Sequence, residues 1–217
     1  MKPELKDKIK TIRHDYTKHQ LLEENIDKNP LIQFGTWLHE AFENGDEMAN
    51  AFSLSTVDKD NYPTSRIVLL RDVSNGCFTF FTNYDSHKGQ EMKQNNKVSM
   101  LFFWKELQRQ VRISGEVEFL PEIDSDEYFK SRPRESQLAA LASSQSQIIS
   151  NRSELEAKFI EITNLYKNKE VPKPKHWGGY SLKAHKIEFW QGRESRLHDR
   201  IQYTFINNEW KIERLSP

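Results

Sequence analysis

The chain has 217 residues, and its 32 lysines and arginines are balanced by 32 aspartates and glutamates, so the formal net charge at pH 7 is zero. A neutral chain is not broadly attracted to nucleic acid or to an anionic membrane surface, and we expect neither as a partner. The single cysteine, Cys77, excludes an internal disulfide and a cysteine metal cluster; we therefore expect no metal and a reducing, cytoplasmic location.

The first 28 residues are charged and carry little apolar periodicity, which predicts a loosely held helix that gains order from what it touches. They lack the apolar core of a secretory signal, and no run in the chain approaches the roughly 20 apolar residues that span a bilayer. After Pro30, Phe34 and Trp37 begin an apolar face at helical spacing, and Gly45 ends this amphipathic helix.

Beyond residue 50 the pattern changes to short apolar or alternating runs separated by turn residues, which is typical of antiparallel strands. Strands are expected over residues 52–57, 65–71, 77–82, 98–104, 110–120, 181–190, 201–206 and 210–215. Helices are expected over residues 85–95, 124–146 with a break at Pro133, and 152–166, and residues 171–176 predict an extended linker.

The expected fold class is therefore mainly β with helices (α+β). About six to eight strands would form an antiparallel sheet closed into a barrel, with helices around it. The strand over residues 65–71 has an apolar centre that we expect to be buried on both faces, and Asn207 with Asn208 suits a hairpin turn. Rossmann and P-loop phosphate motifs are not found in the sequence.

Two strand ends and one helix start carry candidate anion-binding residues. Arg66 and Arg71 flank an apolar run and face opposite sides of the sheet, and each guanidinium suits a phosphate. Taken alone, this segment is better explained as a buried strand with solvated ends. Ser86, His87 and Lys88 open a helix whose free N–H groups suit a phosphate, but an ordinary helix cap with surface charges fits equally well.

A second candidate set lies around Pro133, which suits the first turn of a helix. Arg132 and Ser136 are four residues apart and share a helix face, and Tyr128 arrives from the preceding turn. This trio offers a guanidinium, a hydroxyl and a phenol to one anion. The alternative is a capped surface helix with a core tyrosine.

The strongest segment lies near the carboxyl end. If it is extended, Arg196, His198 and Arg200 line one face, where they repel one another unless an anion is present. The arginines also disfavour the charged form of His198, which leaves a neutral imidazole for hydrogen bonding. A solvated basic edge strand is the alternative, but Leu197 and Trp190 imply partial burial and fit it less well.

Several motifs along the chain can be read together. Residues 188–200 read E-F-W-Q-x-x-x-x-R-L-H-D-R, residues 66–71 read R-I-V-L-L-R, and residues 128–137 read Y-F-x-S-R-P-R-x-S-Q. They are joined by F-F-T-N at 80–83, R-Q-V at 109–111, Gln145-Ser146, W-G-G at 177–179 and W-K-I-E-R-L-S-P at the end. With these motifs the chain resembles the pyridoxine/pyridoxamine 5′-phosphate oxidase family, from Arg13-x-x-Tyr16 onward.

The resemblance implies an FMN-binding split β-barrel that forms a homodimer, with two FMN molecules at the subunit interface. It also implies a helical lid segment over residues 1–28 and a single domain over residues 29–217. The implied cofactor-binding positions are Arg66, Ile67, Val68, Leu69, Leu70, Arg71, Phe81, Thr82, His87, Lys88, Gln110, Gln145, Ser146, Trp190 and Arg200. The implied substrate-binding positions are Arg13, Tyr16, Arg71, Tyr128, Arg132, Ser136, Arg196 and His198, of which Arg196 and His198 are the implied catalytic residues.

The implied reaction oxidises pyridoxine or pyridoxamine 5′-phosphate to pyridoxal 5′-phosphate. Hydride passes from the 4′ carbon to flavin N5, and O2 is the final acceptor and yields H2O2. Arg196 would stabilise the phenolate oxygen of the substrate, and His198 would orient its ring. Arg71 stands where many members have lysine, and His87 stands where many have arginine; both keep a hydrogen-bond donor. His87 is expected to weaken the cationic hold on the FMN phosphate at high pH.

Two other functions are compatible with parts of this pattern. An FMN-dependent reductase on the same barrel should lack the substrate-phosphate set over residues 128–136 and the R-L-H-D-R segment, and both are present. A non-catalytic carrier of pyridoxal 5′-phosphate would bind the product but would not bleach bound flavin.

Overall fold

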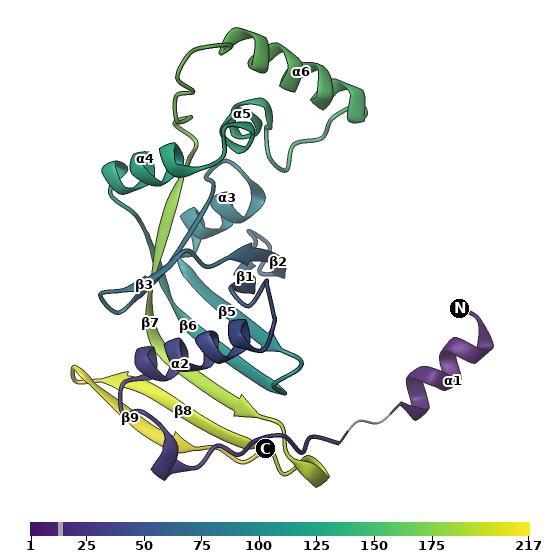
Figure 1. Ribbon diagram of the computed structural model, residues 1–217, viewed down its shortest axis with the longest axis vertical. Helices are drawn as coiled ribbons and strands as arrows, with labels where there is room; N and C mark the ends of the chain where they lie inside the picture. The colour runs from purple at the N-terminus through teal and green to yellow at the C-terminus, as the bar shows by residue number, and fades with distance from the viewer. Residues whose placement is uncertain (13–14) are drawn as a thin grey trace. The chain divides into compact units, whose positions relative to one another are not determined.

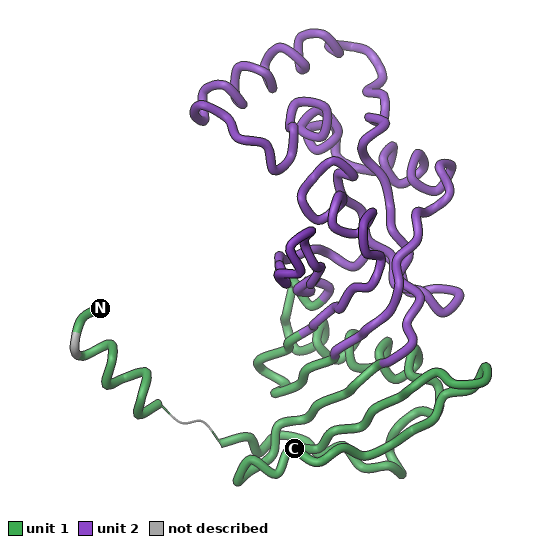
Figure 2. Tube along the Cα trace, turned by 180° about the vertical axis from the view of Figure 1, so that it is seen from behind, with its two compact units in different colours: residues 1–49, 103–111, 187–217 green, residues 50–102, 112–186 purple. Residues whose placement is uncertain are grey.

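The computed structural model of the protein describes residues 1–12 and 15–217 (Figure 1). The predicted substrate residue Arg13 lies outside the described residues. Two compact units divide the chain (Figure 2). Unit 1 consists of Met1–Ala49, Phe103–Val111 and Ile187–Pro217, and unit 2 consists of Asn50–Phe102 and Arg112–Lys186. The division into a lid over residues 1–28 and a domain over residues 29–217 stays a prediction.

A nine-stranded sheet organises the described residues. Its order is β2-β1-β5-β6-β7-β4-β3, with β8 paired to β7 and β9 paired to β8. The β1–β2, β1–β5, β3–β4, β4–β7 and β8–β9 pairs are antiparallel, as predicted. The strands are β1 (Ala51–Val57), β2 (Pro63–Leu69), β3 (Asp72–Ser74), β4 (Cys77–Asn83), β5 (Lys97–Trp104), β6 (Arg109–Phe119), β7 (Trp177–Gln191), β8 (Asp199–Ile206) and β9 (Glu209–Arg214).

Helices lie before the sheet and between its strands. They are α1 (Pro3–Thr11), η1 (Glu23–Asn25), α2 (Pro30–Glu43), α3 (His87–Gln94), α4 (Glu122–Ser131), α5 (Arg134–Ala142), α6 (Arg152–Leu165) and η2 (Glu194–Arg196). Side-chain caps explain two of the starts: Asn29 accepts from the amide of Leu31 at α2, and Ser86 accepts from the amide of Gly89 at α3. Gly45, with φ of 86°, lies just beyond the end of α2.

Aromatic side chains fill the core of each unit. In unit 1, Trp37 of α2 meets Phe189 edge to face at 5.2 Å between ring centroids, and the guanidinium of Arg109 lies 4.4 Å from the Trp37 ring. In unit 2, Phe52 packs edge to face on Phe80 at 5.8 Å. Such rings bury large areas, which compensates for the low hydrophobic content of 36%.

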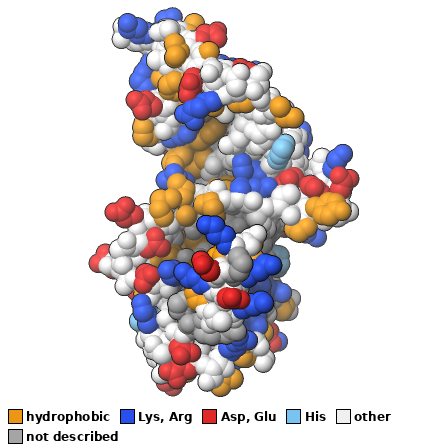
Figure 3. Space-filling model, turned by 90° about the vertical axis from the view of Figure 1, so that its right-hand side faces the viewer, with side chains coloured by type: hydrophobic (Ala, Val, Ile, Leu, Met, Phe, Trp, Pro, Cys, Tyr) orange, Lys and Arg blue, Asp and Glu red, His pale blue; other side chains and the backbone are white. Residues whose placement is uncertain are grey.

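The remaining surface is strongly polar. Lysine and arginine side chains are interspersed with aspartate and glutamate over the face that Figure 3 presents, in keeping with the zero net charge. Within the described chain, no helix combines the length and the apolar character needed to cross a bilayer.

Most strand ends lie within two residues of the prediction, but two parts of the strand pattern differ by more. The turn expected over residues 72–76 contains the short strand β3, because Asn75 and Gly76 alone make the reversal, with φ of 51° and 82°. Strand β7 begins at Trp177 rather than at residue 181. Its Gly179 pairs with Phe81, and an added Cβ there would lie 2.3 Å from Leu120 Cδ1, so this glycine permits close packing and does not mark a turn.

The predicted burial of β2 and the predicted conformation of the segment before β8 were also wrong. The centre of β2 is not buried on both faces: Ile67 is 67% exposed, because β2 is an edge strand. The segment before β8 is not extended, because η2 occupies Glu194–Arg196 and both Ser195 and Arg196 have positive φ. The strand alternation that would align Arg196 with His198 and Arg200 is therefore absent.

Candidate functional site

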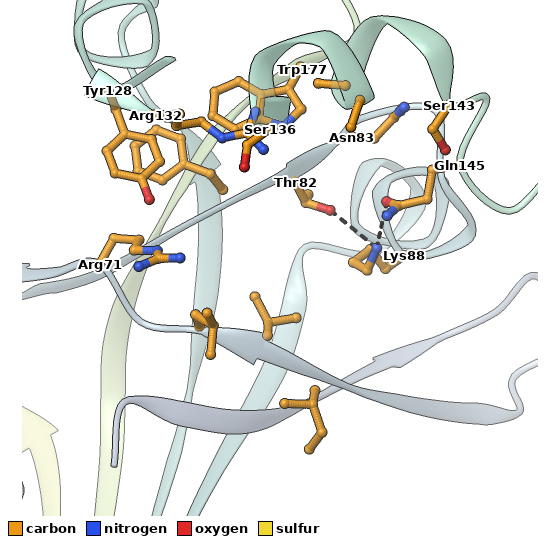
Figure 4. Close-up of a pocket in the computed structure, with 16 residues that line it drawn as sticks. Arg71, Thr82, Asn83, Lys88, Tyr128, Arg132, Ser136, Ser143, Gln145 and Trp177 are labelled. Carbon is orange, nitrogen blue, oxygen red and sulfur yellow. Dashed lines mark hydrogen bonds between the residues drawn. The ribbon is translucent and has the colours of Figure 1, made fainter. Parts of the chain in front are cut away.

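A pocket of about 470 Å³ lies in unit 2 and gathers most of the predicted residues of that unit (Figure 4). Eleven predicted residues line it: Ile67, Val68, Leu69, Arg71, Phe81, Thr82, Lys88, Tyr128, Arg132, Ser136 and Gln145. The exposed part of β2 is thus a wall of this pocket. The same wall offers apolar side chains, while the rest of the lining supplies cations and hydroxyls.

Lys88 marks one end of the pocket, at the start of α3. Its Nζ donates to Thr82 Oγ1 at 3.1 Å and to Gln145 Oε1 at 3.0 Å (Figure 4). It also donates to Ser86 Oγ at 3.3 Å. All three acceptors are neutral, so they leave the ammonium charge uncompensated. Burial, helped by the nearby Arg66 charge, lowers the pKa of Lys88 to about 8.

Arg66, predicted to bind the cofactor, does not line the pocket. Its Nη2 lies 3.0 Å from Glu91 Oε2, and the same carboxylate oxygen accepts from the hydroxyls of Thr56 and Thr64. Burial alone would raise the pKa of Glu91, but these three hydrogen bonds outweigh it and the pKa is lowered. Glu91 is therefore ionised at neutral pH, and Arg66 is already paired.

At the opposite end, two arginines rest on a group of aromatic rings. Tyr128 stacks on Phe81 at 3.8 Å, and Trp177 is nearly parallel to Phe81 at 5.4 Å. The guanidinium of Arg132 lies 4.6 Å from the Trp177 ring, and that of Arg71 lies 5.8 Å from the Tyr128 ring. Cation–π contacts of this kind hold a guanidinium without using its N–H donors.

Arg132 carries the clearest sign of a missing partner. Its Nη1 is buried, and no atom of the described residues accepts a hydrogen bond from it. Burial lowers the pKa of Arg132, and the charge of Arg71 acts in the same direction. An unpaired donor on a buried cation is unfavourable, and an anion in the pocket would satisfy it.

The local backbone explains how Arg132 reaches this position. It lies between α4 and α5 in an extended conformation, with ψ of 149°, and Pro133 caps the start of α5. The expectation that Arg132 and Ser136 share one helix is therefore wrong, because the residue before a proline disfavours helical backbone. Both side chains still line the same pocket with Tyr128.

A second set of predicted residues forms an aromatic cluster in unit 1. The Tyr16 ring meets Trp190 at 5.7 Å and His198 at 5.6 Å, and Trp190 lies 4.8 Å from His198. His198 Nδ1 accepts a hydrogen bond from the backbone amide of Arg193 at 3.1 Å, so a neutral imidazole carries its proton on Nε2. Burial and the charge of Arg196 lower the pKa of His198, while Asp199 opposes them.

Arg200 is not the free cation that the sequence predicted. Its Nε donates to Glu188 Oε1 at 2.8 Å and its Nη1 donates to the carbonyl of Ser216. The hydrogen bond with Glu188 raises the pKa of Arg200. The expected face of three mutually repelling cations is therefore wrong, because one of the three is held by a buried carboxylate.

The other predicted residues lie apart from the pocket lining. Those in unit 2 are Arg66, Leu70, His87 and Ser146, and those in unit 1 are Tyr16, Gln110, Trp190, Arg196, His198 and Arg200. Five lining residues were not predicted: Asn83, Ala139, Ala140, Ser143 and Trp177. The motifs F-F-T-N and W-G-G already contained two of them, and the aromatic residue next to the paired glycines was the available signal.

The fold and the site define a split-barrel protein with a pocket lined by Arg71, Lys88 and Arg132. A family model described as pyridoxamine 5′-phosphate oxidase matches residues 38–166, and one described as the pyridoxine 5′-phosphate oxidase C-terminal dimerisation region matches residues 177–217. The chain belongs to the pyridoxine/pyridoxamine 5′-phosphate oxidase family.

Curated relatives of the same family are similar in sequence over nearly the whole chain. A pyridoxine/pyridoxamine 5′-phosphate oxidase of Leptospira biflexa is 49% identical over 206 residues, which is 95% of this chain and 97% of that protein. One of Nostoc sp. is 48% identical over 210 residues, which is 96% of this chain and 98% of that protein. At this coverage the aligned region includes residues of both units.

Solved structures agree on the fold. PhzG from Burkholderia lata, in complex with tetrahydrophenazine-1-carboxylic acid, has a TM-score of 0.86 and 28% identity, and covers 93% of this chain and 100% of that one. A pyridoxamine 5′-phosphate oxidase-related, FMN binding protein from Nostoc punctiforme has a TM-score of 0.69 at 14% identity over 85% of this chain and 95% of that one, which shows the fold alone.

These comparisons confirm the family, the α+β split barrel and, through the dimerisation region, the homodimer. The prediction of an FMN-dependent oxidase acting on pyridoxine or pyridoxamine 5′-phosphate is confirmed at the level of the family.

Proposed function

We propose that this protein uses FMN to oxidise pyridoxine or pyridoxamine 5′-phosphate to pyridoxal 5′-phosphate, with O2 as the final acceptor and H2O2 as product. One observation carries the proposal: within the described residues, a single pocket has at one end an ammonium, Lys88, whose hydrogen-bond acceptors are all neutral, and at the other a guanidinium donor, Arg132 Nη1, without an acceptor. Two separate anion-binding ends suit two molecules that each bear a phosphate.

The Lys88 end fits the phosphate of FMN. The amides at the start of α3 and the ammonium of Lys88 favour an anion there, and Thr82 and Gln145 offer further hydrogen bonds. The apolar wall of residues 67–69 suits the flavin ring. We assign Leu70, His87, Gln110, Ser146, Trp190 and Arg200 to the cofactor site on the family resemblance.

The Arg132 end fits the phosphate of the substrate. Arg71, Tyr128 and Ser136 add a second guanidinium, a phenol and a hydroxyl, so a phosphate there would satisfy the donors that the protein leaves unpaired. Contacts at the phosphate fix the substrate at a point remote from the reacting 4′ carbon and thereby set its geometry. When bound, FMN supplies the hydride acceptor.

On the family resemblance we assign His198, whose ring contacts Tyr16 and Trp190, to orienting the substrate ring. Because His198 Nδ1 accepts from Arg193, its Nε2–H is the group left to donate to a ligand. The guanidinium of Arg196 would stabilise the phenolate oxygen of the pyridine ring. We further propose that residues 1–28, with Arg13 and Tyr16, act as a lid; the contacts of Tyr16 with Trp190 and His198 support this.

The defining experiment is an anaerobic visible spectrum of the FMN-loaded protein before and after addition of pyridoxine 5′-phosphate. Loss of the flavin band, followed by its recovery and by formation of pyridoxal 5′-phosphate when air is admitted, is expected. An unchanged spectrum with flavin firmly bound would point to another FMN enzyme on this barrel. Failure to bind flavin would favour the carrier of pyridoxal 5′-phosphate.

The Arg196→Met variant tests the catalytic assignment. Removal of a charge that acts on the reacting substrate should lower turnover by about 100-fold while the FMN dissociation constant stays within about twofold. Equal losses of turnover and of FMN binding would contradict the assignment.

A cytoplasmic location is part of the proposal. It rests on Cys77, which is present as a free thiol, as expected in a reducing compartment. Fractionation of the source cells, with the protein followed by antibody, tests it.

A further inference from the structure

The turn between β7 and β8 has an unusual backbone. Ser195 and Arg196 have φ of 54° and 62°, which places two consecutive residues with Cβ atoms in the left-handed region. Each such residue lowers the population of this conformation by roughly tenfold relative to its alternatives. The turn therefore persists only if contacts with its surroundings stabilise it. Both Arg196 and His198 lie in this turn, which spans residues 193–198.

The Asp199 carboxylate makes the contacts that stabilise this turn. It is 9% exposed, and its Oδ2 accepts from Arg193 Nη1 at 3.1 Å, so an ion pair joins the two ends of the turn. The same oxygen accepts from the amide of Leu21 at 3.1 Å, and Oδ1 accepts from Arg214 Nη1 at 2.8 Å. One buried carboxylate thus connects the turn with the N-terminal segment and with β9.

Two hydrogen bonds between uncharged groups lie within the turn itself and do not connect it with other segments. The amide of Leu197 donates to the carbonyl of Glu194 at 3.0 Å, and the amide of Arg193 donates to His198 Nδ1 at 3.1 Å. Both depend on the ends of the turn being held together. If the ends separate, the contact that fixes the His198 ring is lost together with the left-handed conformation of Arg196.

We propose that Asp199 is a positioning residue, which holds the turn of residues 193–198 in its left-handed form and thereby presents Arg196 and His198 to the substrate. The inference rests on the proposed roles of Arg196 and His198. Asp199 makes no contact with the ligand in this scheme and acts only through the turn.

The network provides a matched control. Arg214 also pairs with the exposed Glu23, at 2.6 Å from Nε to Oε1 and 2.8 Å from Nη2 to Oε2. Glu23→Gln removes this second ion pair on the same arginine and leaves the Arg193–Asp199 pair in place. Asp199→Asn makes the same carboxylate-to-amide change on the carboxylate that closes the turn.

The test uses the full-length, FMN-loaded protein and compares wild type, Asp199→Asn and Glu23→Gln. For Asp199→Asn we expect anaerobic flavin reduction by pyridoxine 5′-phosphate to slow by about tenfold or more, and the FMN dissociation constant to change by less than about twofold. Hydrogen exchange of the amides over residues 193–198 should quicken by about tenfold. Glu23→Gln should match wild type within about twofold in all three, because exposed ion pairs are weak.

Two further variants separate positioning from general stability. Arg193→Met removes the same Arg193–Asp199 ion pair but leaves Asp199 paired with Arg214. It should therefore reproduce the kinetic and exchange changes even if Asp199→Asn does not fold. Ser195→Gly removes the penalty of the left-handed conformation at one position, and when added to Asp199→Asn it should recover part of the lost rate.

Several outcomes would overturn the inference. Wild-type reduction rates in both Asp199→Asn and Arg193→Met would do so, and so would unchanged exchange over residues 193–198. A loss of rate matched by an equal loss of FMN affinity and not relieved by Ser195→Gly would show a merely structural role. If wild type itself fails to reduce flavin, the proposed function fails, while the exchange measurement still decides whether Asp199 holds the turn.

Discussion

The affinity for FMN should fall as the pH rises through 8, and Lys88 should be the cause. Its ammonium is buried beside neutral acceptors and near the Arg66 charge, which lowers its pKa to about 8 in the ligand-free protein. A bound phosphate dianion would favour the charged ammonium and raise that pKa again. FMN binding above pH 8 must therefore be accompanied by uptake of a proton.

The expected size follows from the linkage of the two equilibria. With a pKa of about 8, Lys88 is about 90% protonated at pH 7 and about 10% protonated at pH 9. If the complex keeps Lys88 fully protonated, the apparent dissociation constant for FMN rises by about tenfold over this interval, equivalent to about 1.4 kcal/mol. Below pH 7 this group should contribute no slope.

Flavin fluorescence quenching, measured from pH 6 to pH 9.5, provides the assay. Riboflavin is the control ligand, because it has the same ring and no phosphate, and its affinity should show no break at pH 8. The Lys88→Met variant should bind FMN about 10- to 100-fold more weakly at pH 7, since it loses hydrogen bonds from a charged group, and the slope should vanish. A pH dependence of the FMN dissociation constant that persists in Lys88→Met would refute the reasoning and would point to His87 as the cause.

Two other substitutions test the cation at the far end of the pocket and the ion pair of Arg66. Arg132→Met removes the unpaired buried guanidinium and should raise the KM for pyridoxine 5′-phosphate by about 10- to 100-fold with little change in FMN affinity; steady-state kinetics and fluorescence titration check this, and a purely FMN-linked defect would contradict it. Glu91→Gln weakens the pair with Arg66 and should reduce the free energy of unfolding at pH 7 by about 1–3 kcal/mol in urea titrations. Because the pKa of Glu91 is lowered in the folded protein, its contribution is present above about 4.5 and is lost as the pH falls through the folded value, so the variant should lose less stability than wild type in acid.

Much of the fold followed from the sequence, because strand and helix periodicities are local. Asp85 or Ser86 was predicted to cap α3, and Ser86 is the cap. Asn207 with Asn208 was predicted to turn the chain, and both have positive φ between β8 and β9. The strand predicted over residues 181–190 left out the paired glycines 178 and 179, which lie within β7. Their role is to admit the Tyr84 hydroxyl and the Leu120 side chain against β7, and close approach by a distant segment leaves no local signal.

The candidate site was predictable in its residue types and less so in its geometry. Tyr128, Arg132 and Ser136 were placed together by helical spacing, and they do meet, although Pro133 breaks the helix between them. The turn that carries Arg196 was predicted as a strand. The pattern R-L-H-D-R alternates like a strand, and only the long-range ion pairs of Asp199 hold it in another form.

Which cations already have a carboxylate partner cannot be read from a sequence. Arg66 and Arg200 look as suitable for phosphate as Arg71 and Arg132, but the first two already face Glu91 and Glu188. Among the ion pairs of the described residues, none includes Arg71, Arg132 or Lys88, although all three line one pocket. A pocket that gathers three cations without a carboxylate partner among the described residues is electrostatically unfavourable when empty, and this supports the proposal that it binds an anionic ligand.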